Sequence, residues 1–262
     1  MQEIIITTVV IGVIGLIIGI ALVAAGKKFY VAVDEKAIAV RECLPGNNCG
    51  ACGYAGCDAV AAAIAAGDAP ANACPVCSAD AVAKIGGVMG VEAEAAQRKT
   101  AQVKCSGDCE HTSAKCNYVG IEDCRAAALA GLNTGSCTFG CLGYGSCVKV
   151  CTYDAIHVVN GVAKVDTSKC VGCGMCAKAC PKGLIEVVRA DRTFVVQCSN
   201  KDRGPAVKKV CSAGCLGCGA CVKQCEHDAI HLEGNLAYID YDKCVGCGKC
   251  AEKCPAKNIV RQ

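Results

Sequence analysis

The feature that most restricts how this chain can fold is a set of nine cysteines that occurs twice. Each cysteine of the first set has a counterpart 74 residues later, and no gap interrupts the correspondence. Spacing of this kind is typical of thiolates that converge on an inorganic cluster, so we interpret the repeat as a duplicated unit that binds iron–sulfur clusters. The first set is Cys124, Cys137, Cys141, Cys147, Cys151, Cys170, Cys173, Cys176 and Cys180, and the second is Cys198, Cys211, Cys215, Cys221, Cys225, Cys244, Cys247, Cys250 and Cys254.

The composition favours iron–sulfur ligation over other uses of cysteine. Cysteine accounts for 28 of the 262 residues, whereas aromatic residues make up 4% and tryptophan is absent. Small domains with few large side chains bury little apolar surface, and metal–thiolate bonds can supply the missing folding free energy. A disulfide framework would require an oxidising compartment, and structural zinc sites usually show two separated cysteine pairs. The net charge of +3, without a basic cluster, argues against a nucleic-acid partner.

The N-terminal segment predicts a membrane anchor. Residues Ile4–Ala25 contain no charged residue, and a helix of this length rises about 33 Å, enough to cross the hydrocarbon core of a bilayer. A cleaved signal peptide would instead begin with a basic stretch and have a shorter apolar core. Lys27 and Lys28 follow the segment, which places the rest of the chain on the cytoplasmic side. We expect residues 1–26 to form a single-pass anchor in the cell membrane.

A first group of cysteines follows this anchor. The sequence LPGNNCGACGYAGC and a later Cys-Pro pair contain the pattern C-x2-C-x4-C-x16-C, made by Cys49, Cys52, Cys57 and Cys74. Glycines between these cysteines allow the positive φ angles that a loop around a cluster requires. The alanine-rich run Asp58–Gly67 predicts a helix that carries the chain back to the fourth cysteine. We expect one [4Fe-4S] cluster here, with Cys43 and Cys77 as free thiols just outside it.

Two runs of the type C-x2-C-x2-C-x3-C-P are typical of bacterial ferredoxins with two [4Fe-4S] clusters, in which the fourth cysteine ligates the other cluster of the pair. They are Cys170, Cys173, Cys176, Cys180 and Pro181, and Cys244, Cys247, Cys250, Cys254 and Pro255. The partner run in the second copy is Cys215, Cys218, Cys221 and Cys225. We therefore assign Cys215, Cys218 and Cys221 with Cys254 to one cluster, and Cys244, Cys247 and Cys250 with Cys225 to the other.

The first copy departs from this pattern at one position. Its partner run is Cys141, Tyr144, Cys147 and Cys151, so a tyrosine replaces the middle cysteine. Our preferred replacement ligand is Cys137, which gives one set of Cys137, Cys141, Cys147 and Cys180 and another of Cys151, Cys170, Cys173 and Cys176. The alternatives are a three-iron cluster or an empty half, and the counterpart Cys211 has no evident role in the second copy. We expect about five [4Fe-4S] clusters in the chain, with four or six as the alternatives.

The repeated units predict an α+β fold. Short apolar runs at 156–159 and 162–165, and again at 230–232 and 236–239, flank Asn-Gly and Gly-Asn pairs, which is typical of β-hairpins. Between the first cluster and the repeats, residues 78–102 predict a helix, a break at two glycines and a second helix. The predicted organisation is an anchor at 1–26, a small 4Fe-4S-binding domain at 27–77, a connector with additional cysteines at 78–123, and tandem dicluster ferredoxin-like units at 124–195 and 196–262.

Four cysteines, Cys105, Cys109, Cys116 and Cys124, lie at irregular spacings before the first ferredoxin run, and only Cys124 among them belongs to the duplicated set. The sequence Val-Lys-Cys-Ser around Cys105 resembles Val-Gln-Cys-Ser around Cys198, so we expect these two cysteines to share a structural role. The four could hold a further cubane, form a zinc site with His111, or be structural thiols. Ligand type alone does not separate these alternatives.

The order of these features resembles that of the B subunits of Rnf complexes. The anchor, the LPGNNCGACGYAGC motif with Cys74-Pro75 and the tandem ferredoxin units are similar to that family over essentially the whole chain. Complexes of that family oxidise reduced ferredoxin, reduce NAD⁺ and couple the reaction to Na⁺ or H⁺ translocation. The resemblance implies that this chain receives electrons from soluble ferredoxin and passes them to other membrane subunits. Tyr144, Cys109 and Cys116 depart from the regular pattern and leave the number of clusters open.

The residues themselves indicate one-electron transfer. The sequence has no nucleophile–base pair, phosphate-binding loop or GxGxxG motif that opens a helix after a strand, so we expect no NAD site on this chain. Its activity would be that of one component of an ion-translocating ferredoxin:NAD⁺ oxidoreductase. The alternative function is a membrane-tethered redox sensor or assembly protein whose clusters are structural.

Overall fold

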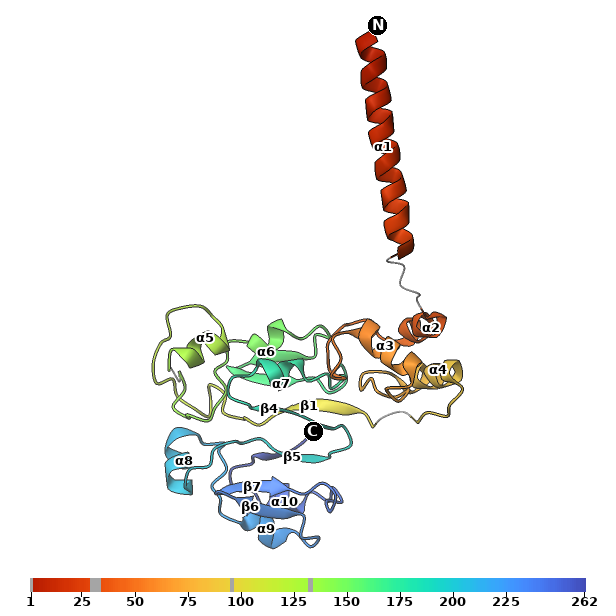
Figure 1. Ribbon diagram of the computed structural model, residues 1–262. Helices are drawn as coiled ribbons and strands as arrows, with labels where there is room; N and C mark the ends of the chain where they lie inside the picture. The colour runs from red at the N-terminus through yellow and green to blue at the C-terminus, as the bar shows by residue number, and fades with distance from the viewer. Residues whose placement is uncertain (1, 29–33, 95–96, 132–133) are drawn as a thin grey trace.

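A long helix stands apart from a globular part that contains all the cysteines (Figure 1). The computed structural model describes residues 2–28, 34–94, 97–131 and 134–262, and within the long helix it describes the side chains of residues 6, 12–26 and 28. The globular part consists of a helical domain near the long helix, a first α+β unit beside that domain, and a second α+β unit beneath the first (Figure 1).

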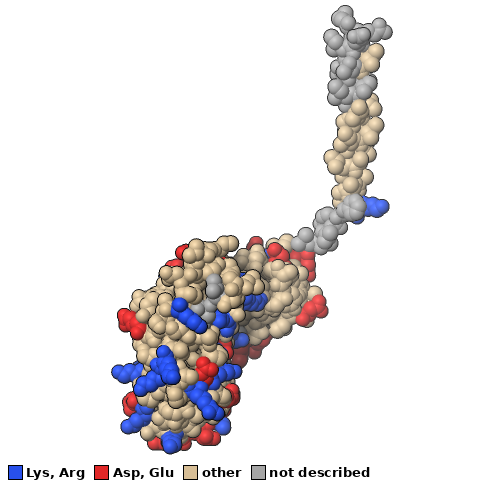
Figure 2. Space-filling view, turned by 90° about the vertical axis from the view of Figure 1, so that its left-hand side faces the viewer, with Lys and Arg blue, Asp and Glu red and all other residues tan. Residues whose placement is uncertain are grey.

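Helix α1 (Gln2–Lys28) covers the predicted anchor. Figure 2 shows the described part of this helix almost entirely without charged side chains. Where side chains are described, no helix is long and apolar enough to cross a membrane. The predicted span Ile4–Ala25 begins among residues whose side chains lie outside that description.

The helical domain consists of α2 (Glu35–Cys43), α3 (Cys57–Ala66) and α4 (Ala79–Met89). Helices α2 and α4 each begin after an N-cap side chain that accepts a hydrogen bond from a backbone N–H of the first turn. Helix α3 confirms the helix predicted over 58–67, and Gly67 ends it in the left-handed conformation. The core of the domain is formed by the buried side chains of Val40, Val60, Ile64 and Ile85.

The prediction of two helices with a break over residues 78–102 is wrong. Helix α4 continues through Gly86 and Gly87 and ends at Gly90, which has a φ of 69°. A Cβ atom on Gly86 would lie 2.6 Å from the carbonyl oxygen of Val91, so glycine lets the chain turn back directly against the helix. In place of the second helix the chain forms strand β1 (Lys99–Val103), because this segment pairs with a strand far away in the sequence.

Among the described residues, the two units contain four two-stranded antiparallel sheets. In the first unit β1 pairs with β4 (Ile185–Arg189), and β2 (Ile156–Val159) pairs with β3 (Val162–Val165). In the second unit β5 (Phe194–Val196) pairs with β8 (Ile259–Arg261), and β6 (Ile230–Glu233) pairs with β7 (Leu236–Ile239). Both predicted hairpins are therefore confirmed. Their turns place Asn160-Gly161 and Gly234-Asn235 at positive φ, as two-residue hairpin loops require.

Six short helices lie in the described portions of the two units, and five of them contain one cysteine each. They are α5 (Cys124–Leu129), α6 (Ser146–Lys149), α7 (Met175–Ala179), α8 (Gly204–Val210), α9 (Ala220–Gln224) and α10 (Lys249–Glu252). Four of them, α6, α7, α9 and α10, begin after a glycine in the left-handed conformation, and a cysteine lies two residues after each of these glycines. The glycine lets the loop around the cysteines turn abruptly into the helix.

The two units contact each other near strands β1 and β5 (Figure 1). The Gln102 side-chain amide donates a hydrogen bond to the carbonyl oxygen of Val196, and the Ser199 hydroxyl donates one to the carbonyl oxygen of Lys104 at 2.9 Å. Strand β1 is followed by Cys105 and strand β5 by Cys198. These two cysteines therefore hold equivalent places in the two units.

The units differ in the length of the segment that follows these strands. Cys105 and Cys137 are 32 residues apart, whereas their counterparts Cys198 and Cys211 are only 13 residues apart. The longer segment of the first unit includes α5 and contains Cys109, Cys116 and Cys124. Spacing alone pairs Cys124 with Cys198, but in the structure the counterpart of Cys198 is Cys105.

Candidate iron–sulfur sites

Many of the described cysteines in the globular part line small pockets, and they do not converge on a site for a single metal ion. Among the described residues, no three Cys, His, Asp or Glu side chains converge closely enough to hold one metal ion. Four separate pockets are instead each lined by four or more cysteines. Four cysteines around a cavity suit a [4Fe-4S] cluster, which takes four thiolate ligands.

The predicted N-terminal set lies in the helical domain. Cys57 and Cys74 are buried in its core, and Cys52 packs against them. Burial, followed by the nearby thiols of Cys49 and Cys74, raises the pKa of Tyr153 to about 12. Cys49 and Cys74 therefore lie on the side of the domain that meets the first unit.

The outer cysteines of this domain are close to the predicted set. The Cys77 thiol donates a hydrogen bond to the sulfur of Cys74, which lowers the pKa of Cys74 and raises that of Cys77. Cys57 and Cys43 also lie near enough to raise the pKa of Cys77. Cys77, which we expected to be a free thiol, thus contacts a predicted ligand directly.

One pocket of the first unit is lined by Cys151, Cys170, Cys173 and Cys176, as the ferredoxin spacing predicts. Two backbone N–H groups point at its sulfurs, with Ala101 N 3.3 Å from Cys170 Sγ and Ala155 N 3.5 Å from Cys151 Sγ. Burial raises the pKa of Cys176 to about 11. Desolvated sulfurs that face N–H donors fit a bound cluster, because these donors stabilise its negative charge.

The other pocket of the first unit differs from our prediction, because Cys124 takes the place that we expected for Cys137. The lining cysteines are Cys124, Cys141, Cys147 and Cys180. Burial raises the pKa of Cys147 to about 12, and the thiols of Cys141, Cys124 and Cys180 add to the increase. The four thiols are therefore close neighbours, while Cys137 lines a different pocket.

The substitution of cysteine by Tyr144 is compensated by helix α5. The ring of Tyr144 lies 5.3 Å from that of Tyr118 and packs against the small core that includes Cys124. The Ser146 hydroxyl accepts a hydrogen bond from Cys124 N and donates one to Asp123, the N-cap of α5, both at 2.7 Å. The tyrosine thus supports the helix that supplies the fourth cysteine. The sequence signals only that a ligand is missing, not which cysteine replaces it.

In the second unit, a pocket is lined by Cys225, Cys244, Cys247 and Cys250, as predicted. Three members of the other predicted set, Cys215, Cys221 and Cys254, lie together. Burial raises the pKa of Cys221 to about 11, and the thiols of Cys215 and Cys254 add to the increase. Cys218, the remaining member of that set, is exposed.

A further group of cysteines lies between the two units and was not predicted as a set. Its pocket is lined by Cys105, Cys137, Cys198 and Cys211, together with Cys141 of the first unit. The similar sequences around Cys105 and Cys198, and the absence of an evident role for Cys211, were the only signals of this group. No spacing rule joins cysteines that come from four separate loops.

The other residues considered for an additional site do not come together. Cys109 and Cys116 are exposed, whereas Cys105 and Cys124 line two different pockets. The Nδ1 atom of His111 lies 2.6 Å from a carboxylate oxygen of Asp108. In the part of the chain that the structure describes, these residues therefore do not form the zinc site or the cubane that we considered.

The helical domain and the first unit meet where two of these sets face each other. The side-chain amide of Asn47 donates a hydrogen bond to the hydroxyl of Tyr153. Burial raises the pKa of Cys173, and the thiol of Cys49 adds to the increase. Cys49 of the N-terminal set and Cys173 of the first unit are therefore neighbours across this contact.

Three segments match models of known protein families. Residues 44–76 match a model described as an Fe-S cluster, residues 163–186 match a 4Fe-4S binding domain, and residues 214–258 match a 4Fe-4S dicluster domain. The first segment holds the N-terminal set, and the other two lie in the first and second units. Iron–sulfur binding is thus supported in all three portions of the globular part.

Three curated relatives align with most of the chain, and each is the B subunit of an ion-translocating complex. The chain is 45% identical over 235 residues to that of the Na⁺-translocating ferredoxin:NAD⁺ oxidoreductase complex of Acetobacterium woodii, an alignment that covers 89% of this chain and 71% of the relative. It is 40% identical to that of the proton-translocating ferredoxin:NAD⁺ oxidoreductase complex of Clostridium ljungdahlii, with coverages of 92% and 85%. It is 37% identical to that of the ion-translocating oxidoreductase complex of Methanosarcina acetivorans, with 94% of each chain covered.

Proposed function

The chain belongs to the family of B subunits of ion-translocating ferredoxin:NAD⁺ oxidoreductase (Rnf) complexes, and we propose on this basis that it is the electron-relay component of such a complex. It would accept electrons from soluble ferredoxin and pass them through its clusters to other membrane subunits, and from there towards NAD⁺. The complex as a whole would couple this transfer to the translocation of Na⁺ or H⁺.

Five sets of cysteines would hold the clusters of this relay. Cysteine thiolates bound to iron supply one-electron redox chemistry, and the loops of this chain keep successive sets close together. The sets are Cys49, Cys52, Cys57 and Cys74; Cys151, Cys170, Cys173 and Cys176; Cys124, Cys141, Cys147 and Cys180; Cys215, Cys218, Cys221 and Cys254; and Cys225, Cys244, Cys247 and Cys250.

The protein would tune these sites through its backbone. In three places the backbone N–H four residues after the last cysteine of a run donates a hydrogen bond to the sulfur of that cysteine. These are Ala155 N to Cys151 Sγ, Leu184 N to Cys180 Sγ and Ala229 N to Cys225 Sγ, at 3.4 to 3.5 Å. Hydrogen bonds to a ligand sulfur stabilise the more negative, reduced state of a cluster and so raise its potential. The repeated geometry supports a common tuning of the two units.

The observation that carries the proposal is the proximity of Cys49 and Cys173: the Cys49 thiol adds to the raised pKa of Cys173, and the nearby Asn47 amide donates a hydrogen bond to the Tyr153 hydroxyl. It brings the N-terminal set next to the ferredoxin-like clusters, so electrons have a short path from the first unit into the helical domain. Helix α2 of that domain follows α1 in the chain (Figure 1). We therefore place the N-terminal cluster last in the relay, where electrons leave for the membrane partners.

We further propose that α1 anchors the protein in the cell membrane, with the clusters on the cytoplasmic side. Apolar side chains of the described part project from the helix without packing partners; Leu16 is 65% exposed and Leu22 67% exposed. Such a surface is unfavourable in water and favourable in lipid. The uncharged run Ile4–Ala25 and the lysine pair that follows it support this orientation.

The relay order can be tested in membranes that contain the complete complex. Replacement of Cys49 by Ala should remove the N-terminal cluster and reduce ferredoxin-dependent NAD⁺ reduction to background. The clusters of the two α+β units should still be reduced by ferredoxin, as followed by EPR. The matched control is Cys116→Ala, which changes an exposed cysteine outside the four-cysteine pockets and should leave activity intact. Unimpaired NAD⁺ reduction by the Cys49→Ala complex would contradict the proposed order.

A further inference from the structure

The pocket between the two units has the features of a cluster site. Its volume is about 440 Å³, compared with 410, 340 and 350 Å³ for the three other pockets that are lined by four cysteines. Cys198 and Cys211 are each only 7% exposed. Gly107 brings two of the sulfurs together, since a Cβ atom on it would lie 3.3 Å from Cys211 Sγ and 3.7 Å from Cys105 Sγ.

The four cysteines are related by the duplication. Cys105 and Cys198 follow equivalent strands, and Cys137 and Cys211 are equivalent members of the two cysteine runs. The contacts cross between units: Gly107 of the first unit approaches Cys211, and the corresponding residue of the second unit, Asn200, donates its side-chain amide to Cys137 Sγ at 3.5 Å. Each unit therefore contributes one cysteine of each kind, as a local twofold arrangement requires.

Backbone N–H groups point at the sulfurs here as they do in the predicted sites. Cys141 N lies 3.5 Å from Cys105 Sγ, and the equivalent Cys215 N lies 3.3 Å from Cys198 Sγ. A second donor, Asn200 N, lies 3.5 Å from Cys198 Sγ. Such donors are those expected around sulfurs that carry negative charge as cluster ligands.

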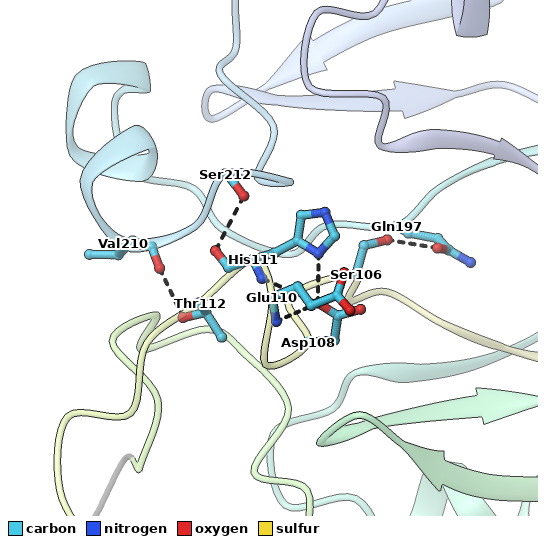
Figure 3. Close-up of polar contacts among 8 residues, drawn as sticks. All are labelled: Ser106, Asp108, Glu110, His111, Thr112, Gln197, Val210 and Ser212. Atoms are coloured by element: carbon cyan, nitrogen blue, oxygen red, sulfur yellow. Dashed lines mark hydrogen bonds and ion pairs between the residues drawn. The ribbon is translucent and has the colours of Figure 1, made fainter.

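Hydrogen bonds of the lining residues Ser106, Thr112 and Gln197 and of their neighbours hold the walls of the pocket together (Figure 3). The Ser106 hydroxyl donates to the Gln197 side chain at 2.7 Å, and the Thr112 hydroxyl donates to the carbonyl oxygen of Val210 at 2.9 Å. Ser212 N donates to the carbonyl oxygen of His111 at 2.9 Å. The loop from 106 to 112 is thereby fastened to the second unit on both sides of Cys211.

We propose that Cys105, Cys137, Cys198 and Cys211 bind a sixth [4Fe-4S] cluster, which connects the two ferredoxin-like units. This inference rests on the relay function proposed above. The donors Cys141 and Cys215 are themselves predicted ligands of the two flanking clusters, so the new site lies directly between those clusters. When bound there, the cluster would supply one-electron redox chemistry: it would be reduced as one flanking cluster is oxidised, and it would be reoxidised as the other flanking cluster is reduced. Each cysteine releases its proton when its sulfur bonds to iron.

The first test is the replacement of Cys198 by Ala in the full chain, produced anaerobically with its cluster-assembly system. The wild type should contain about 24 iron atoms and as many labile sulfides, and the variant should lose about four of each. Cys109→Ala, in the loop that lines the pocket, changes an exposed cysteine and should lose none. An unchanged iron content in the Cys198→Ala variant, or zinc in place of iron in the wild-type pocket, would overturn the proposal.

A second variant keeps all four cysteines, so the proposal can be tested even if the Cys198→Ala chain fails to fold. Asn200→Asp retains the oxygen that accepts a hydrogen bond from Asp202 N at 2.8 Å, but it replaces the amide donor to Cys137 Sγ by a negative charge. Iron content should be unchanged, and the potential of one cluster should fall in an EPR-monitored titration. If no potential moves, the pocket holds no cluster. Failure of reduced ferredoxin to reduce the wild-type chain would instead contradict the relay function, while leaving the iron stoichiometry as a separate result.

Discussion

The close contact between Gly172 and strand β1 allows a quantitative test of how the first unit supports its clusters. Gly172 lies between the predicted ligands Cys170 and Cys173 and has a φ of 67°. A Cβ atom at this position would lie 2.7 Å from both Cβ and the carbonyl oxygen of Lys99. Strand β1 cannot easily move away, because Lys99–Val103 is paired with β4. The substitution Gly172→Ala should therefore introduce both backbone strain and a steric overlap.

The two effects can be separated with a matched control. A non-glycine residue in the left-handed conformation costs roughly 1–2 kcal/mol, and overpacking of a closely packed site costs about 1–3 kcal/mol more. Gly183 of the same unit has a φ of 61° but no atom within 4 Å of its added Cβ. Gly183→Ala should thus show only the first cost, whereas Gly172→Ala should show both.

The assay is the loss of cluster absorbance in the presence of an iron chelator under anaerobic conditions. If the strain is released when the cysteine loop opens, an extra 2 kcal/mol accelerates cluster loss about 30-fold relative to the control variant. Only the clusters of the first unit should show the faster phase. Equal rates of loss in Gly172→Ala and Gly183→Ala would refute the view that β1 forms the wall of this cluster loop.

Two further predictions concern the cluster ligands of the first unit and the stability of the second unit at alkaline pH. Cys124→Ala should remove the cluster that Cys124 and Cys141 are proposed to share, and it should lower the iron content by about four atoms per chain. Cys137→Ala should leave the EPR signal of that cluster unchanged. The reverse pattern would favour Cys137 as the ligand that replaces the cysteine missing at Tyr144. Burial raises the pKa of Tyr241 from 10.0 to about 12, so its contribution to stability should be complete below pH 10 and lost as pH rises towards 12. Tyr241→Phe keeps the ring beneath Arg192 and should flatten this loss in alkaline unfolding experiments, while an unchanged pH profile would exclude Tyr241 as its source.

Local spacing predicted the sites in which three of the four cysteines come from a single run of sequence. Cys170, Cys173 and Cys176 gather with Cys151 around one pocket, and Cys244, Cys247 and Cys250 gather with Cys225 around another. Three cysteines spaced in this way must lie on one tight loop, whatever surrounds that loop. The hairpins were predictable for the same reason, because their turn residues and apolar runs are adjacent in the chain.

Spacing was misleading where the partner is distant. Residues 99–103 carry a helix-compatible sequence, but they form a strand because β4 offers an edge for pairing more than 80 residues later. Cys124 and Cys198 occupy the same position in the two sets of nine cysteines. Cys124 nevertheless lies on a helix of the first unit, whereas Cys198 follows β5. Because the segment after β1 is longer in the first unit, the structural counterpart of Cys198 is Cys105, although the cysteine spacing pairs Cys198 with Cys124.

The amino-acid sequence by itself determined the chemistry of this protein: cysteine runs that bind iron–sulfur clusters, their duplication, and an apolar N-terminal helix. Short-range spacing is sufficient for this because a loop of a few residues has little freedom once its thiolates share a cluster. Tertiary structure alone decided that Cys124, rather than Cys137, lines a pocket with Cys141, Cys147 and Cys180, that Cys49 lies near Cys173, and that four cysteines from separate loops line another pocket. These arrangements depend on how the two units and the helical domain pack, and packing brings together residues whose distance in the sequence carries no information about their distance in space.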